Sequence, residues 1–425
     1  MRKGSDTRAI GTVVLLVVLA TIASAPAECF AQRGPRSQRI IERMDADGDG
    51  RIDRSEWLRA PQAFDRIDRD GDGYVTAEEL TIFLRHRFSD RGGPGAGPRA
   101  SGTDTSTNGP LEIVDTHVHL GFGPKERNFE LAVDEALSKM PQRHVMLAIL
   151  IPTPQMGSNQ NRYDHNELRQ VARSDRFRIA GGSGVLGKIL YAGGSVSEQD
   201  KEAFRTLAQS MVDSGIVAFG EIGLYHFGVP RAGNVFGRVP LDHPLLDVLG
   251  DVAARSGIPI DVHFEVVPRD INLPRHLQGA GNPDHLEANL RQFERFLSRN
   301  KRAKIVWAHA GYEALPFRTP TLCRTLLQQH ENLFMSIRLT KGITKKPSAA
   351  MDSDGNLKEE WRQLFIAFPD RFVFGSESVY GSVQSRRFND EFVLYQNLLA
   401  RLPPSVAHKI ASANAKAIYR LGPKK

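Results

Sequence analysis

Short runs of apolar and β-branched residues alternate with amphipathic stretches from residue 111 to the C-terminus. Eight runs have the length and composition of buried strands: 112–120, 144–154, 177–186, 216–224, 258–265, 304–311, 332–339 and 371–378. Between most of them apolar residues recur at helical spacing, as in 202–215 and 289–300. Strands separated by helices indicate parallel pairing, and the number eight predicts an α/β fold that closes into a (β/α)8 TIM barrel over residues 111–425. An open doubly wound sheet is the alternative.

The first 31 residues have the pattern of a targeting segment. A basic start, MRKGSDTR, precedes the apolar run IGTVVLLVVLATIASA, which ends in small residues. This pattern predicts a cleaved signal peptide over residues 1–31, and hence a periplasmic or secreted protein. An uncleaved anchor helix is the alternative, but the apolar run is shorter than the ~20 residues that a membrane span needs. We therefore expect no stable membrane span after cleavage.

Two acidic segments, DADGDGRIDRSE and DRDGDGYVTAEE, repeat one spacing of side-chain oxygens with a glycine at position 6. A hard cation such as Ca²⁺ takes six to eight oxygen ligands, the glycine permits a sharp turn, and the glutamate at position 12 completes the shell. The pair resembles EF-hand loops and predicts a small all-α EF-hand pair over residues 38–87. Its expected calcium-binding residues are Asp45, Asp47, Asp49, Arg51, Glu56, Asp68, Asp70, Asp72, Tyr74 and Glu79. Residues 88–110 lack apolar periodicity and predict a flexible linker.

Composition narrows the class of protein. Apolar residues make up 40% of the 425 residues, which is enough to build a large core. Two cysteines exclude a disulfide framework. The net charge of +7 is spread along the chain, which is more typical of a solvated surface than of a nucleic-acid-binding face. We therefore expect a small-molecule substrate and leave nucleic acid as a less favoured partner, and the oligomeric state stays open.

Histidines and acids recur where the predicted strands end. The first run ends in His117 and His119, and later runs end in Glu221, His263, His309 and Glu377. In a (β/α)8 barrel the carboxyl ends of all strands surround one mouth, so these side chains are expected to converge there. Residues i and i+2 of a strand share a face, which directs both histidines of the first run inward. Neutral imidazoles and carboxylates bind borderline metals, so the pattern predicts a divalent metal site.

The motifs IVDTHVHL, FGSES and SANAKAIYRL resemble the amidohydrolase superfamily, in its amidohydrolase-related branch, and GEIGL is similar to its TatD-like branch. The resemblance covers nearly all of 111–421. It implies that His117, His119, Glu221, His263 and His309 bind one or two metal ions, most often Zn²⁺, and that Glu221 is either a bridging ligand or a third protein ligand. The family carries Asp after its eighth strand as a metal ligand and general acid/base. This chain has Glu377 there, one methylene longer.

These observations predict an exported metal-dependent hydrolase of an amide, ester or lactone. The metal would lower the pKa of a water molecule to about 7, and Glu377 would transfer its proton to the leaving group. Arg338 and Lys341, just after the seventh strand, are candidates to bind a carboxylate or phosphate of the substrate, with plain surface charges as the equal alternative. His226 is a further candidate base, although an ordinary loop residue is the favoured interpretation. The alternatives are a TatD-like nuclease or phosphodiesterase, a decarboxylase of the same branch, and a catalytically inactive calcium-dependent binding protein.

Overall fold

The chain divides into two compact units, Met1–Ser106 and Thr107–Lys425. The computed structural model describes residues 40–41, 44–45, 47, 49–54, 56–57, 64, 67–68, 73–80, 111–121, 128–156, 163–228, 235–312, 314–340, 346–381 and 385–422. The predicted signal peptide and the predicted linker lie outside the described residues, as do Asp70, Asp72 and Lys341. The domain boundaries given above stay predictions, and each unit is described by itself.

A short antiparallel ladder holds the N-terminal unit together. Strands β1 (Ile52–Asp53) and β2 (Tyr74–Val75) pair so that Ile52 lies opposite Val75. Both residues are fully buried in a small apolar cluster that includes Phe64. This unit was expected to be all helical. It also contains a two-residue strand from each of its two calcium loops, and these strands pair with each other.

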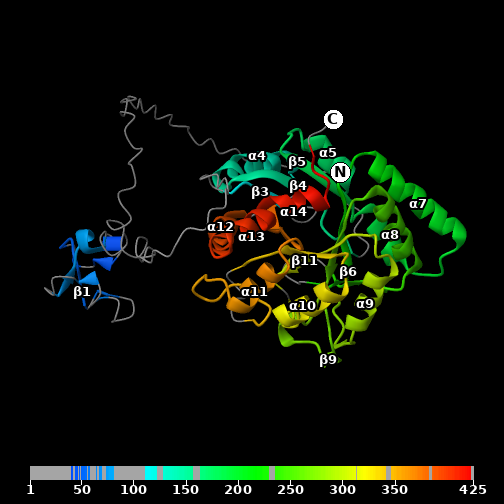
Figure 1. The fold of residues 1–425 in the computed structure, drawn as a ribbon. Helices are drawn as coiled ribbons and strands as arrows, with labels where there is room; N and C mark the ends of the chain where they lie inside the picture. The colour runs from blue at the N-terminus through cyan, green and yellow to red at the C-terminus, as the bar shows by residue number, and fades with distance from the viewer. Residues whose placement is uncertain are drawn as a thin grey trace, which may run out of the picture. The chain divides into compact units, whose positions relative to one another are not determined.

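The second unit is the predicted barrel. Its parallel strands occur in chain order around the sheet and are β3 (Ile113–Leu120), β4 (Val145–Leu150), β5 (Phe177–Gly182), β6 (Ala218–His226), β8 (Ile260–Phe264), β11 (Ile305–Ala310), β12 (Leu333–Ile337), β13 (Phe372–Phe374) and β14 (Ser378–Tyr380). All eight runs expected from the sequence contain a strand. Figure 1 shows helices such as α7, α8, α9 and α10 outside these strands.

The eighth strand is split in two, and its halves close the ring. The first half, β13, pairs with β12, whereas β14 pairs with β3, the first strand of the barrel. Across the break, the Glu377 amide donates to the His117 carbonyl at 2.9 Å and the Thr116 hydroxyl donates to the Phe374 carbonyl at 2.9 Å. Closure removes the open sheet edges that would otherwise need another cover. The doubly wound alternative is therefore wrong.

Helices surround the barrel, and the last of them, α14, lies across one end of it. They are α4 (Phe129–Lys139), α5 (His165–Val171), α6 (Val185–Ala192), α7 (Glu198–Asp213), α8 (Pro244–Ser256), α9 (Leu290–Arg299), α10 (Pro320–Gln329), α11 (Glu359–Ala367), α12 (Ser385–Ala400), α13 (Pro404–His408) and α14 (Asn414–Ile418). Local sequence fixes several ends. Ser197 and Asp200 form a capping box at the start of α7, and Gly257, with φ of 72°, ends α8.

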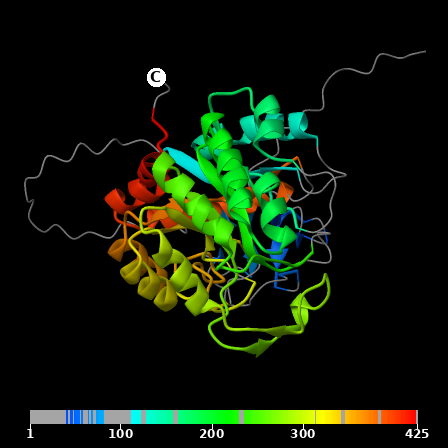
Figure 2. The same ribbon diagram turned by 90° about the vertical axis from the view of Figure 1, so that its right-hand side faces the viewer.

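Short strands lie in the long segments that follow β6 and β8. Strand β7 (Gly237–Arg238) pairs with the end of β6, and β9 (Ile271–Asn272) pairs with β10 (His285–Leu286). The hairpin of β9 and β10 belongs to the long segment after β8 and projects from the barrel (Figure 2). Its connection contacts the segment after β6, because the Asn282 side chain accepts from the Gly228 amide at 2.8 Å and donates to the Gly228 carbonyl at 2.9 Å.

An apolar cluster fills the inside of the barrel below the predicted ligands. Its members are Val114, Ile149, Ile151, Ala180, Ala218, Val306, Val373, Ala415, Ile418 and Tyr419, and we call it the inner cluster. Val114, Ala218 and Val306 come from the first halves of their strands, and the last three members come from α14 and the residue that follows it. Lys304, which precedes β11, donates to the Ile418 carbonyl at 3.0 Å. Helix α14 therefore closes the end of the barrel opposite the mouth.

Candidate metal centre

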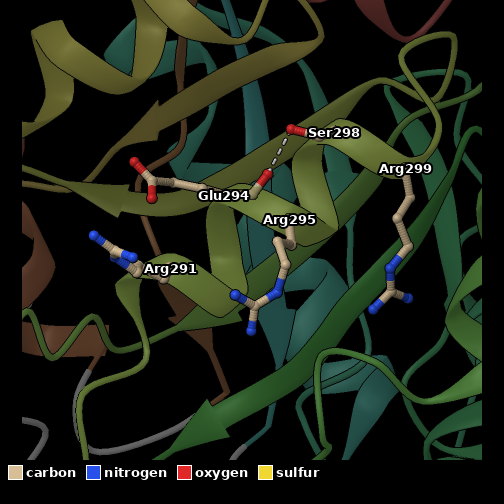
Figure 3. Close-up of a pocket in the computed structure, with 5 residues that line it drawn as sticks. All are labelled: Arg291, Glu294, Arg295, Ser298 and Arg299. Carbon is tan, nitrogen blue, oxygen red and sulfur yellow. Dashed lines mark hydrogen bonds between the residues drawn. The ribbon is translucent and has the colours of Figure 1, made fainter.

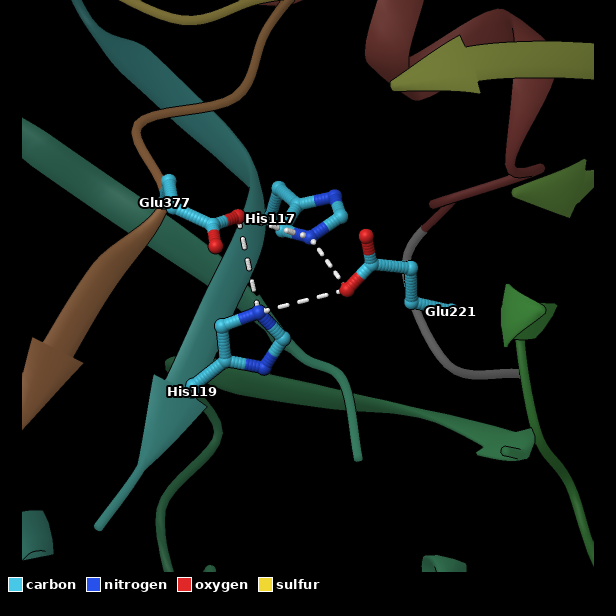
Figure 4. A group of neighbouring side chains, drawn as sticks. All are labelled: His117, His119, Glu221 and Glu377. Carbon is cyan, nitrogen blue, oxygen red and sulfur yellow. Dashed lines mark ion pairs between the residues drawn. The ribbon is translucent and has the colours of Figure 1, made fainter. Parts of the chain in front are cut away.

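All six predicted ligands meet at the carboxyl ends of the strands. Ligand atoms of His117, His119, Glu221 and Glu377 lie within 4.8 Å of one another, and so do those of Glu221, His263 and His309. Figure 4 shows the first group, with the histidines of β3 between the two carboxylates. Glu377 is the most exposed of the six, with 14% of its side chain accessible. The barrel thus gathers six N and O donors from five strand ends into one buried cluster.

Glu221 belongs to both groups, and its two oxygens face different partners. Its Oε2 lies 3.4 Å from His117 Nε2 and 3.6 Å from His119 Nε2. Its Oε1 lies 2.7 Å from His263 Nδ1 and 3.1 Å from His309 Nε2. Glu221 would therefore help to hold a cation beside His117 and His119 and another beside His263 and His309.

Glu377 reaches the cluster from the break in the eighth strand. Its Oε2 lies 3.0 Å from His117 Nε2, 3.5 Å from His119 Nε2 and 3.6 Å from His309 Nδ1. Both Glu377, with φ of 58°, and His309, with φ of 74°, occupy the left-handed backbone region. Residues other than glycine rarely adopt that conformation, and where they do the strain often accompanies a functional site. The backbone, rather than side-chain length alone, therefore sets where these two donors point.

Three of the four histidines have an outer partner on the ring nitrogen that faces away from the cluster. His119 Nδ1 contacts the Ile151 carbonyl at 2.7 Å. His117 Nδ1 lies 3.4 Å from Asp261 Oδ2, and His263 Nε2 lies 3.4 Å from Glu265 Oε1. Metal-binding histidines commonly have such partners, which fix the ring orientation and tautomer. The pattern leaves one nitrogen of each ring directed at the cluster.

Asp261 and Glu265 were not predicted as site residues. Both are buried, with exposed fractions of 0% and 5%. They stand two residues before and two residues after His263 in the segment DVHFE, so strand periodicity places all three on one face. That spacing was the signal that could have identified them.

A buried arginine supports the backbone beside two of the ligands. Arg318 is only 1% exposed and donates to the Phe264 carbonyl at 2.9 Å and to the Ala308 carbonyl. Its guanidinium also lies 3.9 Å from the centre of the Trp307 ring. Because Phe264 follows His263 and Ala308 precedes His309, Arg318 ties together the ends of β8 and β11 where these ligands begin.

The charges within the cluster are strongly coupled. Burial alone lowers the pKa of His117, but the carboxylates of Asp261 and Glu221 outweigh it and raise this pKa well above its usual value. Burial raises the pKa of Glu221, but His117 and the hydrogen bonds of His263 and His309 bring it well below its usual value. The pKa of His263 is raised to about 9 because hydrogen bonds to Glu221 and Glu265 overcome the effect of burial. A divalent cation would therefore displace protons from the imidazoles when it binds.

The donor set fits such a cation. Among the described residues, His117 Nε2, His309 Nδ1 and Glu377 Oε2 are buried without a hydrogen-bond partner. Buried polar atoms rarely remain unpaired, and three of them aimed at one point fit a bound cation. Imidazole and carboxylate donors suit Zn²⁺ and other divalent transition metals.

Family comparisons agree with this geometry. Residues 114–421 match a family model described as Amidohydrolase. The chain belongs to the amidohydrolase family. It is a metal-dependent hydrolase, because this family match is joined by a buried His and Glu cluster suited to a metal. Residues 38–60 and 62–92 match two models described as EF hand and EF-hand domain. No curated protein matches the chain.

Several solved structures are similar to the amidohydrolase chain. Amidohydrolase 2 from Bifidobacterium longum subsp. infantis is 11% identical with a TM-score of 0.39, and the match covers 73% of this chain and 99% of that one. A D-hydantoinase (dihydropyrimidinase) from Thermus sp. is 13% identical with a TM-score of 0.44, covering 73% and 70%. Similarities at these scores say nothing about the substrate of this chain.

Of the other residues predicted for the amidohydrolase site, Arg338 lies at the mouth. Its Nη1 is 3.6 Å from Glu377 Oε1. His226, at the end of β6, packs against His263 with ring centroids 4.2 Å apart, and burial lowers its pKa to about 4. His226 is therefore part of the site rather than of a distant loop. Lys341 lies outside the described residues.

The described calcium loops have the expected local geometry. The position 6 glycines Gly50 and Gly73 have φ of 84° and 88°, in the region that glycine adopts without strain. In each loop the aspartate at position 1 accepts from this glycine amide, Asp45 at 2.8 Å and Asp68 at 3.1 Å. Ligand atoms of Asp45, Asp47 and Glu56 lie within 4.8 Å of one another. The amidohydrolase thus carries a calcium-binding module before its barrel.

A hollow on the outside of the barrel is unrelated to the metal centre. It lies over α9, encloses about 580 Å³, and is lined by Arg291, Glu294, Arg295, Ser298 and Arg299 (Figure 3). None of the six candidate ligands contributes to it. Arg299 is paired with Asp247 at 2.8 Å, so part of this basic surface is already neutralised.

Proposed function

We propose that this protein is an exported hydrolase that cleaves an amide, ester or lactone bond of a small molecule at a centre of two Zn²⁺ ions. The single observation that supports it most strongly is the position of Glu221. One oxygen of this buried carboxylate faces His117 and His119, and the other faces His263 and His309. His117, His119 and Glu221 would hold one cation and Glu221, His263 and His309 would hold another, and such a pair would suit hydrolysis.

The proposed cations have one chemical role. When bound, they supply Lewis acids that polarise the substrate carbonyl and lower the pKa of a water molecule to about 7. Glu377 is the carboxylate that accepts the water proton and returns it to the leaving group. Its side chain is the most exposed of the six donors, and its Oε2 faces three histidines of the cluster. Arg338 holds Glu377 from its other oxygen at 3.6 Å.

The alternatives have less support. An inactive barrel was suggested by the longer side chain of Glu377, yet Glu377 Oε2 lies 3.0 Å from His117 Nε2, a distance that one shared cation could span. A nuclease needs a basic surface beside its metal centre, whereas the described arginines of α9 line a hollow outside the barrel. No observation of the described residues favours decarboxylation over hydrolysis.

Export and zinc belong to the proposal. The signal peptide over residues 1–31 is supported by its basic start and apolar run alone. No helix among the described residues is long and apolar enough to cross a bilayer. Zinc is favoured over harder cations because four of the six donors are imidazoles.

A hydrolysis screen of the purified full chain tests the proposed function. The protein is loaded with Zn²⁺ and assayed on simple amides, esters and lactones, beside Glu377→Gln and Glu377→Asp. We expect hydrolysis by the parent, a loss of at least about 100-fold in kcat for Glu377→Gln, and partial activity for Glu377→Asp, because only the last retains a base. Full activity of Glu377→Gln, or activity in chelator-treated protein, would contradict the proposal. Activity only in Glu377→Asp would favour an inactive parent.

A further inference from the structure

Three neighbouring strand ends build a cationic position beside the metal centre. Tyr312 follows β11, Arg338 follows β12, and Glu377 lies in the break of the eighth strand. The Arg338 guanidinium stacks over the Tyr312 ring at 4.0 Å from its centre, and its Nη1 lies 3.6 Å from Glu377 Oε1. Stacking on an aromatic face fixes a guanidinium in a defined plane. Tyr312 and Glu377 therefore hold the Arg338 guanidinium in place at the rim of the barrel mouth.

Most N–H donors of this guanidinium have no acceptor among the described residues. In the part of the chain that the structure describes, the Arg338 side chain makes one ion pair, through Nη1, and no hydrogen bond. Its Nη2 and Nε groups have no acidic neighbour there, and 25% of the side chain is exposed. A guanidinium offers five N–H donors in one plane, and the pair formed by Nη2 with Nε or Nη1 matches the two oxygens of a carboxylate. Arg338 thus presents an unused edge next to Glu377.

The local charge favours a carboxylate over a phosphate. Among described residues, Arg338 is the sole Arg or Lys within 4.0 Å of a candidate carboxylate ligand, Glu221 or Glu377. A single guanidinium balances one negative charge, whereas a phosphate dianion attracts several cationic groups or a row of backbone amides. Glu377 already lies against one end of the guanidinium, so a second anion must approach from the other edge.

We propose that Arg338 binds a carboxylate of the substrate, so that the hydrolase acts on small amides, esters or lactones that carry a carboxylate close to the scissile carbonyl. The proposal rests on the proposed function, because it places the scissile carbonyl at the metal centre. Tyr312 is a positioning residue that orients the guanidinium. A substrate carboxylate held by Arg338 would fix the distance between the scissile carbonyl and Glu377. This orientation of the reacting groups raises the rate of hydrolysis.

Binding of short dicarboxylates tests the proposal without turnover. The full chain is loaded with Zn²⁺, its metal content is measured, and malonate, succinate and glutarate are titrated by calorimetry against their monoamides. Each pair offers the metal one carboxylate and differs only in the second group. We expect at least one diacid to bind about 10- to 100-fold tighter than its monoamide, the range for one charge-assisted contact. In Arg338→Met this preference should disappear, and in Arg338→Lys it should be partly retained.

Matched variants separate this role from others. Arg295→Met removes an exposed arginine of the α9 hollow and should leave the preference unchanged. Diacids that bind no better than their monoamides, or a preference that persists in Arg338→Met, would overturn the proposal. Metal content that falls in Arg338→Met would show that Arg338 acts through Glu377 instead, which also overturns it. A parent chain that binds no transition metal would refute the proposed function instead. The two failures are distinguishable because metal content is measured before any dicarboxylate is added.

Discussion

Arg318 is the side chain that supports the metal position formed by Glu221, His263 and His309. It donates to the main-chain carbonyls of Phe264 and Ala308, which are the neighbours of His263 and His309 in the chain. It contacts none of the candidate metal donors through these bonds. Burial raises the pKa of Glu265, but the hydrogen bond and charge of His263, followed by the charge of Arg318, bring it down to about 2. Glu265 in turn faces His263 Nε2. Arg318 therefore positions the ligands rather than binding the cation.

Arg318→Met is expected to weaken the metal position formed by Glu221, His263 and His309 while the other position is kept. Loss of such an outer contact typically lowers metal affinity about 10- to 100-fold. Titration of metal-free protein with Zn²⁺, with metal content read by elemental analysis, should show one weakened site, and Arg318→Lys should recover part of the affinity. Equal weakening of both sites, or of neither, would contradict this assignment. Arg295→Met controls for loss of an exposed charge.

At the residue scale, the sequence was enough to predict which histidines and glutamates gather at the mouth, but not the residues that support them. His117 and His119 stand out because two histidines end one apolar run. Asp261 and Glu265 were visible only as partners of His263 at a spacing of two. Arg318 could not be predicted at all, because it lies in a connection and contacts backbone atoms 54 and 10 residues away. Contacts to main-chain carbonyls leave no pattern of residue types.

At the element scale, irregular strands turn the donors toward the mouth. Val114 belongs to the inner cluster, whereas Val118 belongs to a separate and larger apolar cluster, although an ideal strand would place both on one face. The pairing of β3 with β4 shifts register between Asp115 and Val118, and the pairing of β11 with β12 shifts between Trp307 and Ala310. Such bulges re-aim side chains. The apolar runs predicted the strands, but alternation alone gave no sign of these shifts.

Helix α14 is the element that closes the opposite end of the barrel. Ile418 is 4% exposed and packs in the inner cluster with Tyr419. We expect Ile418→Ala to lower the free energy of unfolding by about 2–5 kcal/mol, because it leaves a cavity in a closed core. Urea unfolding followed by circular dichroism measures the change, and Zn²⁺ content of the folded variant should equal that of the parent. An unfolding midpoint equal to that of the parent would refute the role of this helix as a plug.

At the scale of the whole molecule, the EF-hand unit and the barrel have separate cores and separate cation sites. The apolar cluster around Phe64 contains residues of the first unit only. The sequence was sufficient to predict this organisation, because the acidic loops and the strand and helix alternation use different periodicities. Export stays a prediction, since residues 1–31 lie outside the described part.

Calcium binding should therefore be independent of the barrel metal. In a chain with both Glu56→Gln and Glu79→Gln, we expect bound calcium to fall by up to two equivalents, since each loop loses the carboxylate that completes its shell. Zinc content and hydrolysis should not change by more than about twofold. Elemental analysis and the hydrolysis assay on the same preparation measure both. A parallel loss of zinc would contradict the independence of the two units.

The claim on which this account depends is that Glu221 joins two metal positions in one centre. Elemental analysis of zinc-loaded full-length protein and of Glu221→Gln, whose amide has only one oxygen acceptor, tests it most directly. The account predicts two transition-metal equivalents in the parent and fewer than one in the variant. A parent without transition metal, or a variant with the same content as the parent, would contradict it.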